Sequence, residues 1–304
     1  TSIQESAVKP VEPVFLDFKK DMSQLTAKSD IPVLYKQNVT NDLFQLIYVF
    51  DMGNNNDKAL GTAFDYLEYL GTSDMTPEEL KSEFYRLACT FYVSPGNERT
   101  YVVLSGLNEN MPAAMQLFEK LLADAQVNKE AYDNLVGDIL KARADAKLNQ
   151  GQNFSRLMNY AMYGPKSPAT NLLTEAELAS MNPQELVDRI HNQNSYKHRI
   201  LYYGPSSSKD LLATIEQYHQ VPATLKDIPA GNEYSYLETP ATKVLVAPYE
   251  AKQIYMAQIS NLDKKYDPAI EPTRELYNEY FGGGMNSIVF QEMRETRGLA
   301  YSAW

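Results

Sequence analysis

The chain of 304 residues contains one cysteine and three histidines. Because Cys89 is alone, no disulfide can form within the chain. The histidines are His191, His198 and His219, and no two are three or four residues apart, so none of them pair on one helix face as zinc ligands do. We therefore expect no zinc site built on these residues, and we expect each histidine at the surface or at a helix end.

Motifs for nucleophilic and nucleotide chemistry are also missing. The sequence has no G-x-S-x-G nucleophile turn. Residues 204–209, GPSSSK, lack the Gly-Lys-Ser/Thr ending of a phosphate loop, and the triple glycine at 282–284 lacks G-x-G-x-x-G spacing. These absences argue against serine-hydrolase, P-loop and dinucleotide-binding functions.

Long apolar runs and long basic runs are absent as well. No apolar run approaches the roughly 18 residues of a membrane span, and residues 1–15 lack the charged and apolar blocks of a signal peptide. Basic runs reach only two lysines, at 19–20 and 264–265, and the net charge is −11, which argues against a nucleic-acid partner. With 44% apolar and 22% charged residues, the composition is that of a soluble globular protein.

The pattern of elements predicts an α+β fold. Residues 1–26, spotted with proline, serine and lysine, are expected to form an extended linker. Thr76-Pro77-Glu78-Glu79 combines a cap, a proline at the first helical position and a capping box, a strong helix start. Strands are expected at 31–35, 43–50, 89–93, 100–104 and 198–203, and helices at 57–70, from 76, from 111, and at 129–149, 175–180, 183–192 and 206–219.

The opening pattern then starts again after a proline-containing connector at residues 223–240. Strands are expected at 244–247 and 254–259, followed by a helix that ends at Phe281. Residues 66–71 and 277–282, which are 211 positions apart, are identical at four of six positions. We interpret this as a tandem repeat of an α+β domain, complete at 27–222 and incomplete at 241–304.

The last stretch, residues 281–304, contains the most informative sequence pattern. The triple glycine predicts a loop, Asn286 or Ser287 can cap a short helix, and Gly298 can close it in a left-handed conformation. Arg294 and Tyr301 lie seven residues apart across that glycine. The residues alone favour a purely structural interpretation, in which Arg294 interacts with the helix C-terminus and Tyr301 packs in a sheet.

Residues 282–304, GGGMNSIVFQEMRETRGLAYSAW, closely resemble a segment of the second and fourth domains of the pitrilysin/insulinase zinc metallopeptidases, the inverzincins. The resemblance implies four related α+β domains, mostly antiparallel sheets with helices on one face, that form two halves around a closed chamber. In that family the first domain holds zinc through H-x-x-E-H and a distant glutamate. The fourth domain, or a partner subunit, supplies an arginine and a tyrosine that reach the substrate.

Residues 59–104 resemble the family's zinc-bearing region, but the zinc motif is degenerate. In that register H-x-x-E-H falls on residues 65–69, where Asp65 and Tyr69 replace the histidines and only Glu68 survives. The third-ligand glutamate is missing too, because residues 131–174 contain no glutamate. A site that has lost both imidazoles and the distant carboxylate should bind no zinc. The resemblance thus makes residues 27–222 a degenerate third domain and residues 241–304 the start of the fourth.

The spacing of Arg294 and Tyr301 matches the family's substrate-binding pair. Second domains carry similar segments without that role, and the degenerate domain before this segment favours the fourth-domain assignment. One departure is Ile288, where the family usually has arginine, which puts a local contact in doubt. The resemblance then implies the C-terminal half of a zinc peptidase, with zinc held by an N-terminal catalytic half, a peptide substrate, and a location in the bacterial periplasm or envelope.

Two alternatives stay open. The chain can be a non-catalytic partner subunit that binds substrate or acts as a scaffold, or a structural homologue whose Arg294 and Tyr301 face no chamber. An H-x-x-E-H motif in the same reading frame before Thr1 would favour the single-chain enzyme.

Overall fold

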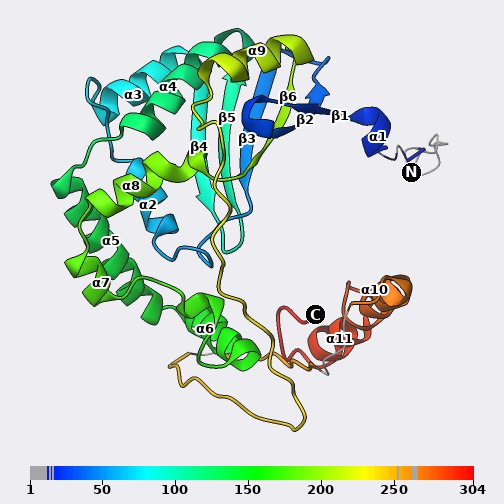
Figure 1. Ribbon diagram of the computed structural model, residues 1–304. Coiled ribbons are helices and arrows are strands. Elements are labelled where there is room, and N and C mark those ends of the chain that lie inside the picture. Colours follow the sequence, from blue (N-terminus) through cyan, green and yellow to red (C-terminus); the bar gives the residue numbers. More distant parts are fainter. Residues whose placement is uncertain (1–11, 14, 16, 252, 262–265) are drawn as a thin grey trace. The chain divides into compact units, whose positions relative to one another are not determined.

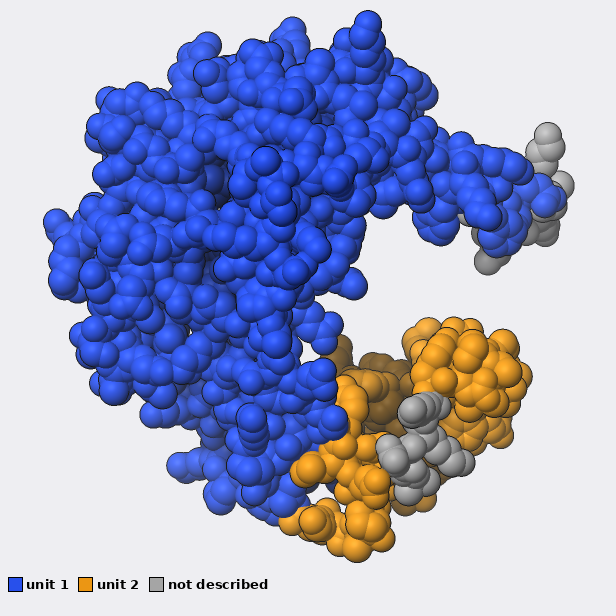
Figure 2. Space-filling view, in the orientation of Figure 1, with its two compact units in different colours: residues 1–235, 245–257 blue, residues 236–244, 258–304 orange. Residues whose placement is uncertain are grey.

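The computed structural model describes residues 12–13, 15, 17–251, 253–261 and 266–304. The chain divides into two compact units, residues 1–235 with 245–257, and residues 236–244 with 258–304 (Figure 2). Much of the expected linker, residues 1–11, 14 and 16, lies outside the described residues. Within the described ranges, no helix is both long and apolar enough to cross a membrane.

The first unit is built on a six-stranded sheet in the order β1-β2-β6-β3-β5-β4 (Figure 1). Only β2 and β6 run parallel, and the other neighbours are antiparallel. This confirms the predicted mostly antiparallel α+β fold. The strands are β1 (Ser23–Thr26), β2 (Pro32–Gln37), β3 (Leu43–Phe50), β4 (Cys89–Pro95), β5 (Thr100–Leu107) and β6 (Arg199–Gly204).

Helices cover one face of this sheet, and the alternation along β3 shows which one. Phe44, Leu46, Tyr48 and Phe50 are buried, because they point toward the helix layer that includes α4 (Figure 1). The helices of this unit are α1 (Phe18–Asp21), α2 (Leu60–Leu67), α3 (Pro77–Arg86), α4 (Met111–Asp124), α5 (Lys129–Lys147), α6 (Gln150–Tyr163), α7 (Glu175–Ser180), α8 (Gln184–Asn192) and α9 (Ser208–Tyr218).

Three local expectations differ from the structure. Ser23–Thr26, at the end of the predicted linker, form β1 because they pair with β2 at the sheet edge. The helix expected at 57–70 is shorter, since α2 spans Leu60–Leu67. A further helix, α6, follows α5 where the sequence signalled none.

The strands expected at 244–247 and 254–259 are absent, and that prediction is wrong. No strand among the described residues lies beside them, so their backbone groups have no ladder partner. The part of this segment in the first unit lies along α5 and α6 instead. Tyr249 donates its hydroxyl to the Leu148 carbonyl at 2.5 Å, and the rings of Tyr255 and Phe154 lie 5.6 Å apart.

The expectation of a surface position is wrong for two of the three histidines. His198 and His219 are 7% and 0% exposed, and their Nε2 atoms lie 2.9 Å apart. His219 does stand at the C-cap of α9, but its imidazole is buried against Glu119 of α4. The two histidines are 21 residues apart, so no local pattern could have predicted their contact.

The second unit contains the glycine-framed stretch. Here α10 (Glu271–Phe281) ends at Gly282, and α11 (Ile288–Phe290) continues into a π-helical turn, η6 (Gln291–Thr296). Of the two expected caps, Ser287 is the one at the N-cap. Gly298 adopts φ +58°, and its N–H bonds the Arg294 carbonyl at 3.0 Å, so the predicted left-handed helix end is confirmed.

Candidate functional site

The degenerate zinc motif lies where α2 ends. Asp65 is in the last turn of α2, Glu68 is the C-cap, and Tyr69 follows the helix. The Tyr69 N–H bonds the Tyr66 carbonyl at 3.0 Å, three residues back, so the chain tightens within the motif. Gly71 then permits a close approach, because a Cβ there would lie 2.3 Å from the Met75 carbonyl oxygen.

The chemistry of this motif does not fit zinc. It offers two carboxylates, Asp65 and Glu68, with no imidazole. Partial burial, and to a lesser extent the nearby Glu68 charge, raise the pKa of Asp65, which favours its neutral form. In the part of the chain that the structure describes, no three histidine, cysteine or acidic side chains are grouped to hold a metal ion.

The helix that should supply a third zinc ligand is joined to α2 by a tyrosine. Tyr66 donates its hydroxyl to the Asn128 carbonyl at 2.6 Å and accepts the Asn128 N–H at 2.9 Å, which fixes α2 to the start of α5. Its ring also meets that of Tyr132 edge-on, with centroids 5.9 Å apart. Hydrogen bonding and aromatic packing therefore make the contact between these two helices.

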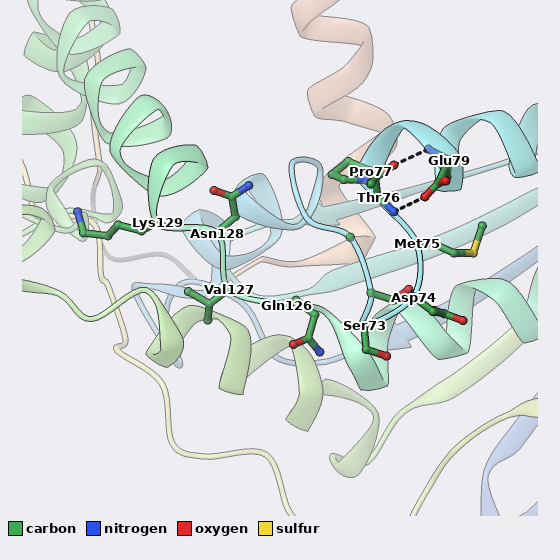
Figure 3. Close-up of a pocket in the computed structure, with 12 residues that line it drawn as sticks. Ser73, Asp74, Met75, Thr76, Pro77, Glu79, Gln126, Val127, Asn128 and Lys129 are labelled. Carbon is green, nitrogen blue, oxygen red and sulfur yellow. Dashed lines mark hydrogen bonds between the residues drawn. The ribbon is translucent and has the colours of Figure 1, made fainter.

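A cavity of about 500 Å³ opens beside this junction, between the loop before α3 and the start of α5 (Figure 3). Both helix starts are already capped: Thr76 Oγ1 accepts the Glu79 N–H at 3.2 Å, and Asn128 Oδ1 accepts the Ala131 N–H at 3.0 Å. The reciprocal bond from the Thr76 N–H to Glu79 confirms the predicted capping box. The cavity lining has no histidine or cysteine, so it offers neither an imidazole nor a thiolate as a zinc ligand.

Arg294 and Tyr301 lie together in the second unit. The Arg294 guanidinium carbon is 5.1 Å from the centre of the Tyr301 ring and 4.7 Å from that of Phe290. The left-handed turn at Gly298 brings the chain back, so that residue 301 returns to residue 294. Both distances are within the range of cation–π attraction, which orients the guanidinium.

The guanidinium keeps its hydrogen-bonding capacity. Its ion-pair partner among the described residues is Glu295, with Nε 3.6 Å from Oε1, which is too long for a hydrogen bond. The Arg294 side chain is 36% exposed, and Tyr301 is 83% exposed. A planar cation with several N–H donors and a nearby phenol suits an acceptor oxygen, such as a peptide carbonyl or a carboxylate.

Phe290 is the member of this cluster that the sequence predictions missed. The signal was available, because Phe290 and Arg294 are four residues apart, and residues so spaced meet on one helix face. The other predicted site residues, Asp65, Glu68 and Tyr69, belong to the first unit.

Comparison with known proteins finds relatives that are named as zinc proteases. No protein-family model matches the chain. An uncharacterized zinc protease of Streptomyces coelicolor is 24% identical over 266 residues, which are 81% of this chain and 55% of the relative. The uncharacterized zinc protease YmxG of Bacillus subtilis is 23% identical over 249 residues, with 79% and 58% covered. The chain thus spans little more than half the length of these relatives.

Solved structures show the same fold. The peptidase M16 inactive domain from Pseudomonas fluorescens matches with a TM-score of 0.65 at 19% identity, covering 92% of this chain and 69% of that one. The periplasmic protease PqqL from Escherichia coli matches with a TM-score of 0.64 at 16% identity, covering 75% and 26%. Together with the zinc-protease relatives, these matches confirm the resemblance seen in the motifs. The chain is thus similar in sequence to proteins named as zinc proteases, and similar in fold to M16 peptidase structures that include an inactive domain.

Proposed function

We propose that this chain is the substrate-positioning half of a zinc metallopeptidase that hydrolyses peptides inside a closed chamber. Residues 27–222 are the zinc-lacking third domain, and residues 241–304 begin the fourth. The observation that carries the proposal is the cluster of Phe290 and Arg294, on a glycine-framed helix, with Tyr301, which follows that helix, in a chain whose own zinc motif has no imidazole.

Each side chain of the cluster has a role in this proposal. Arg294 donates N–H groups to a carbonyl oxygen of the bound peptide, whose negative charge grows during hydrolysis. Tyr301 donates its hydroxyl to the same or the next carbonyl, and Phe290 holds the guanidinium plane by stacking. The zinc and its general base belong to the N-terminal half, since the residues of this chain do not fit the metal.

Partners and location follow from the same proposal. The catalytic N-terminal half is either in the same polypeptide or a separate subunit, and the second partner is the peptide substrate. The neighbour PqqL is a periplasmic protease, which supports a periplasmic or envelope location in a bacterium. A second candidate, a non-catalytic subunit for substrate binding or scaffolding, is favoured by the lost zinc ligands and the fold match to an M16 inactive domain.

The zinc content of the purified chain tests the assignment of halves. We expect well under one zinc per chain and no peptide cleavage, with cleavage appearing when a zinc-bearing half is added. The physical reason is that Asp65 and Glu68 alone supply too few ligands to hold zinc against water. The control is the Asp65→Asn, Glu68→Gln double variant, which should behave identically.

Two results would contradict this assignment. One is stoichiometric zinc that disappears in the double variant, and the other is zinc-dependent cleavage by the chain alone. If the added zinc-bearing half is equally active with and without this chain, the scaffold function is favoured instead.

A further inference from the structure

A buried chain of hydrogen bonds crosses the core of the first unit. Glu119 Oε1 and His219 Nδ1 are 2.6 Å apart, His219 Nε2 and His198 Nε2 are 2.9 Å apart, and His198 Nδ1 is 2.7 Å from the Tyr196 carbonyl oxygen. Glu119 and His219 are at most 1% exposed, and His198 is 7% exposed. We call Glu119, His219 and His198 the buried triad.

The geometry determines how many protons the triad holds. A carbonyl only accepts, so His198 Nδ1 must carry a hydrogen, and the neutral ring then has a lone pair on Nε2. His219 must therefore donate from Nε2. One more proton lies between His219 and Glu119, whichever of the two carries it. The triad thus holds three protons and is neutral overall.

The surroundings enforce that proton count. Glu119 also accepts hydrogen bonds from the Tyr48 hydroxyl at 2.9 Å and from the Asn194 amide at 2.9 Å. Aromatic rings line the histidines. The ring centroids of Phe50 and His198 are 4.7 Å apart, and those of Tyr48 and His219 are 4.4 Å apart. Burial, reinforced by the Glu119 charge, raises the pKa of Tyr48 well above its usual value, so this phenol stays protonated.

An additional proton can bind only at His198 Nε2, and its binding breaks the hydrogen bond between the two imidazoles. The lone pair on His198 Nε2 is the acceptor in the contact between the two imidazoles. If it is protonated, two N–H groups face each other across 2.9 Å, and a net positive charge enters a closed apolar core. The His198–His219 bond therefore exists in only one proton state of the triad.

Both ends of that bond fasten the chain as it leaves α9. We call residues 219–227 the exit segment. Next to His219, the Gln220 N–H donates to Glu119 Oε2 at 3.0 Å. Next to His198, the Lys197 N–H donates to the Lys226 carbonyl at 2.9 Å, and Lys226 also bridges to Tyr196. We infer that opening the imidazole contact weakens these two attachments, while others, such as the hydrogen bond from the Ser29 hydroxyl to the Pro222 carbonyl at 2.7 Å, do not involve the imidazoles.

We propose that the buried triad is a proton-sensitive clasp, which holds the exit segment on the first unit at neutral pH and releases it when His198 takes up a proton. The exit segment includes the start of the connector at residues 223–240, so the clasp regulates how firmly the start of that connector is anchored. This proposal does not depend on the peptidase assignment.

The pKa of His198 is shifted in the direction that the clasp requires. Burial, and then the neighbouring His219, lower the pKa of His198 to about 4 from its ordinary 6.5. A group whose pKa is lower in the closed form stabilises that form fully above pH 6.5, and the stabilisation is lost as the pH falls toward 4. The transition is therefore expected between about pH 6 and pH 4.

Amide hydrogen exchange of the full chain tests the clasp. We expect the protection factor of the Gln220 amide to fall about 50-fold between pH 7 and pH 4.5, from the two pKa values of His198. Amides of the β3–β5 ladder should keep their protection, because that ladder does not depend on the triad. The imidazole of His198, followed by NMR, should titrate over the same pH range as the loss of protection.

Two variants separate the clasp from general acid sensitivity. His198→Gln retains an acceptor for His219 but cannot titrate, and should reduce the pH step to less than about threefold, since the linked proton is gone. The matched control His191→Gln removes a histidine outside the triad and should keep the full step. The proposal is overturned if Gln220 protection is constant with pH, falls in parallel with the ladder, or keeps its step in His198→Gln. It is also overturned if His198 of the unmodified protein titrates near its ordinary 6.5.

Discussion

Replacing Arg294 with alanine is expected to lower kcat/KM for peptide hydrolysis by about 100- to 1000-fold when this chain acts with its catalytic half. The guanidinium is held by the rings of Phe290 and Tyr301, and its donors stay available for a carbonyl oxygen. An interaction that strengthens as charge develops lowers kcat more than it raises KM. Steady-state kinetics on a fluorogenic peptide would measure both parameters.

Arg297 provides the matched control for this experiment. It lies three residues further along the chain and pairs with Glu292 at 3.5 Å. Arg297→Ala removes the same charge from the same segment, so it should leave kcat/KM within about twofold if only the oriented guanidinium acts on substrate. Equal losses in the two variants would indicate a general electrostatic effect. Unchanged turnover in Arg294→Ala at unchanged stability would favour the structural homologue without a substrate role.

Replacing Glu119 with alanine is expected to lower the free energy of unfolding of the first unit by about 3–5 kcal/mol at pH 7. The carboxylate accepts hydrogen bonds from Tyr48, His219, Asn194 and the Gln220 backbone. Removing it leaves these buried groups without their hydrogen-bond partner. Urea unfolding followed by circular dichroism would give the change in midpoint.

The control for this prediction is an exposed ion pair. Glu83 pairs with Arg86 on the surface of α3, where solvent screens the charges, so Glu83→Gln should change the urea midpoint much less. If Glu119→Ala does not fold, Glu119→Gln keeps the shape and part of the bonding and should show an intermediate loss. A Glu119 variant as stable as the Glu83 variant would show that the buried triad contributes little.

Local patterns predicted the regular elements well. The strand at 43–50, the capped start of α3 and the helix at 175–180 were predicted correctly because each is determined by neighbours in sequence. The strands expected at 244–247 and 254–259 are absent because a residue pattern shows only that a segment suits a sheet. A strand also needs a partner strand, and none lies beside these residues in the described structure.

The candidate sites likewise differ in whether their residues are neighbours in sequence. The degenerate motif at Asp65 and the spacing of Arg294 and Tyr301 could be found from the sequence, because they are contiguous and resemble a known family. The buried triad could not, because its members come from α4, the end of α9 and the residue before β6. Only the folded sheet and helix layer bring His198 and His219 into contact.

We propose that Tyr301 and Arg294 touch the peptide while the zinc lies in another half. A photo-crosslinking residue, benzoylphenylalanine, placed at position 301 tests this most directly, in an assembly whose zinc-bearing half has its general-base glutamate changed to glutamine. Tyr277 on α10 is the control position, because it is also exposed. We predict crosslinking of a bound peptide at position 301 and none at 277. No crosslink at 301, or equal crosslinking at both positions, would contradict the claim.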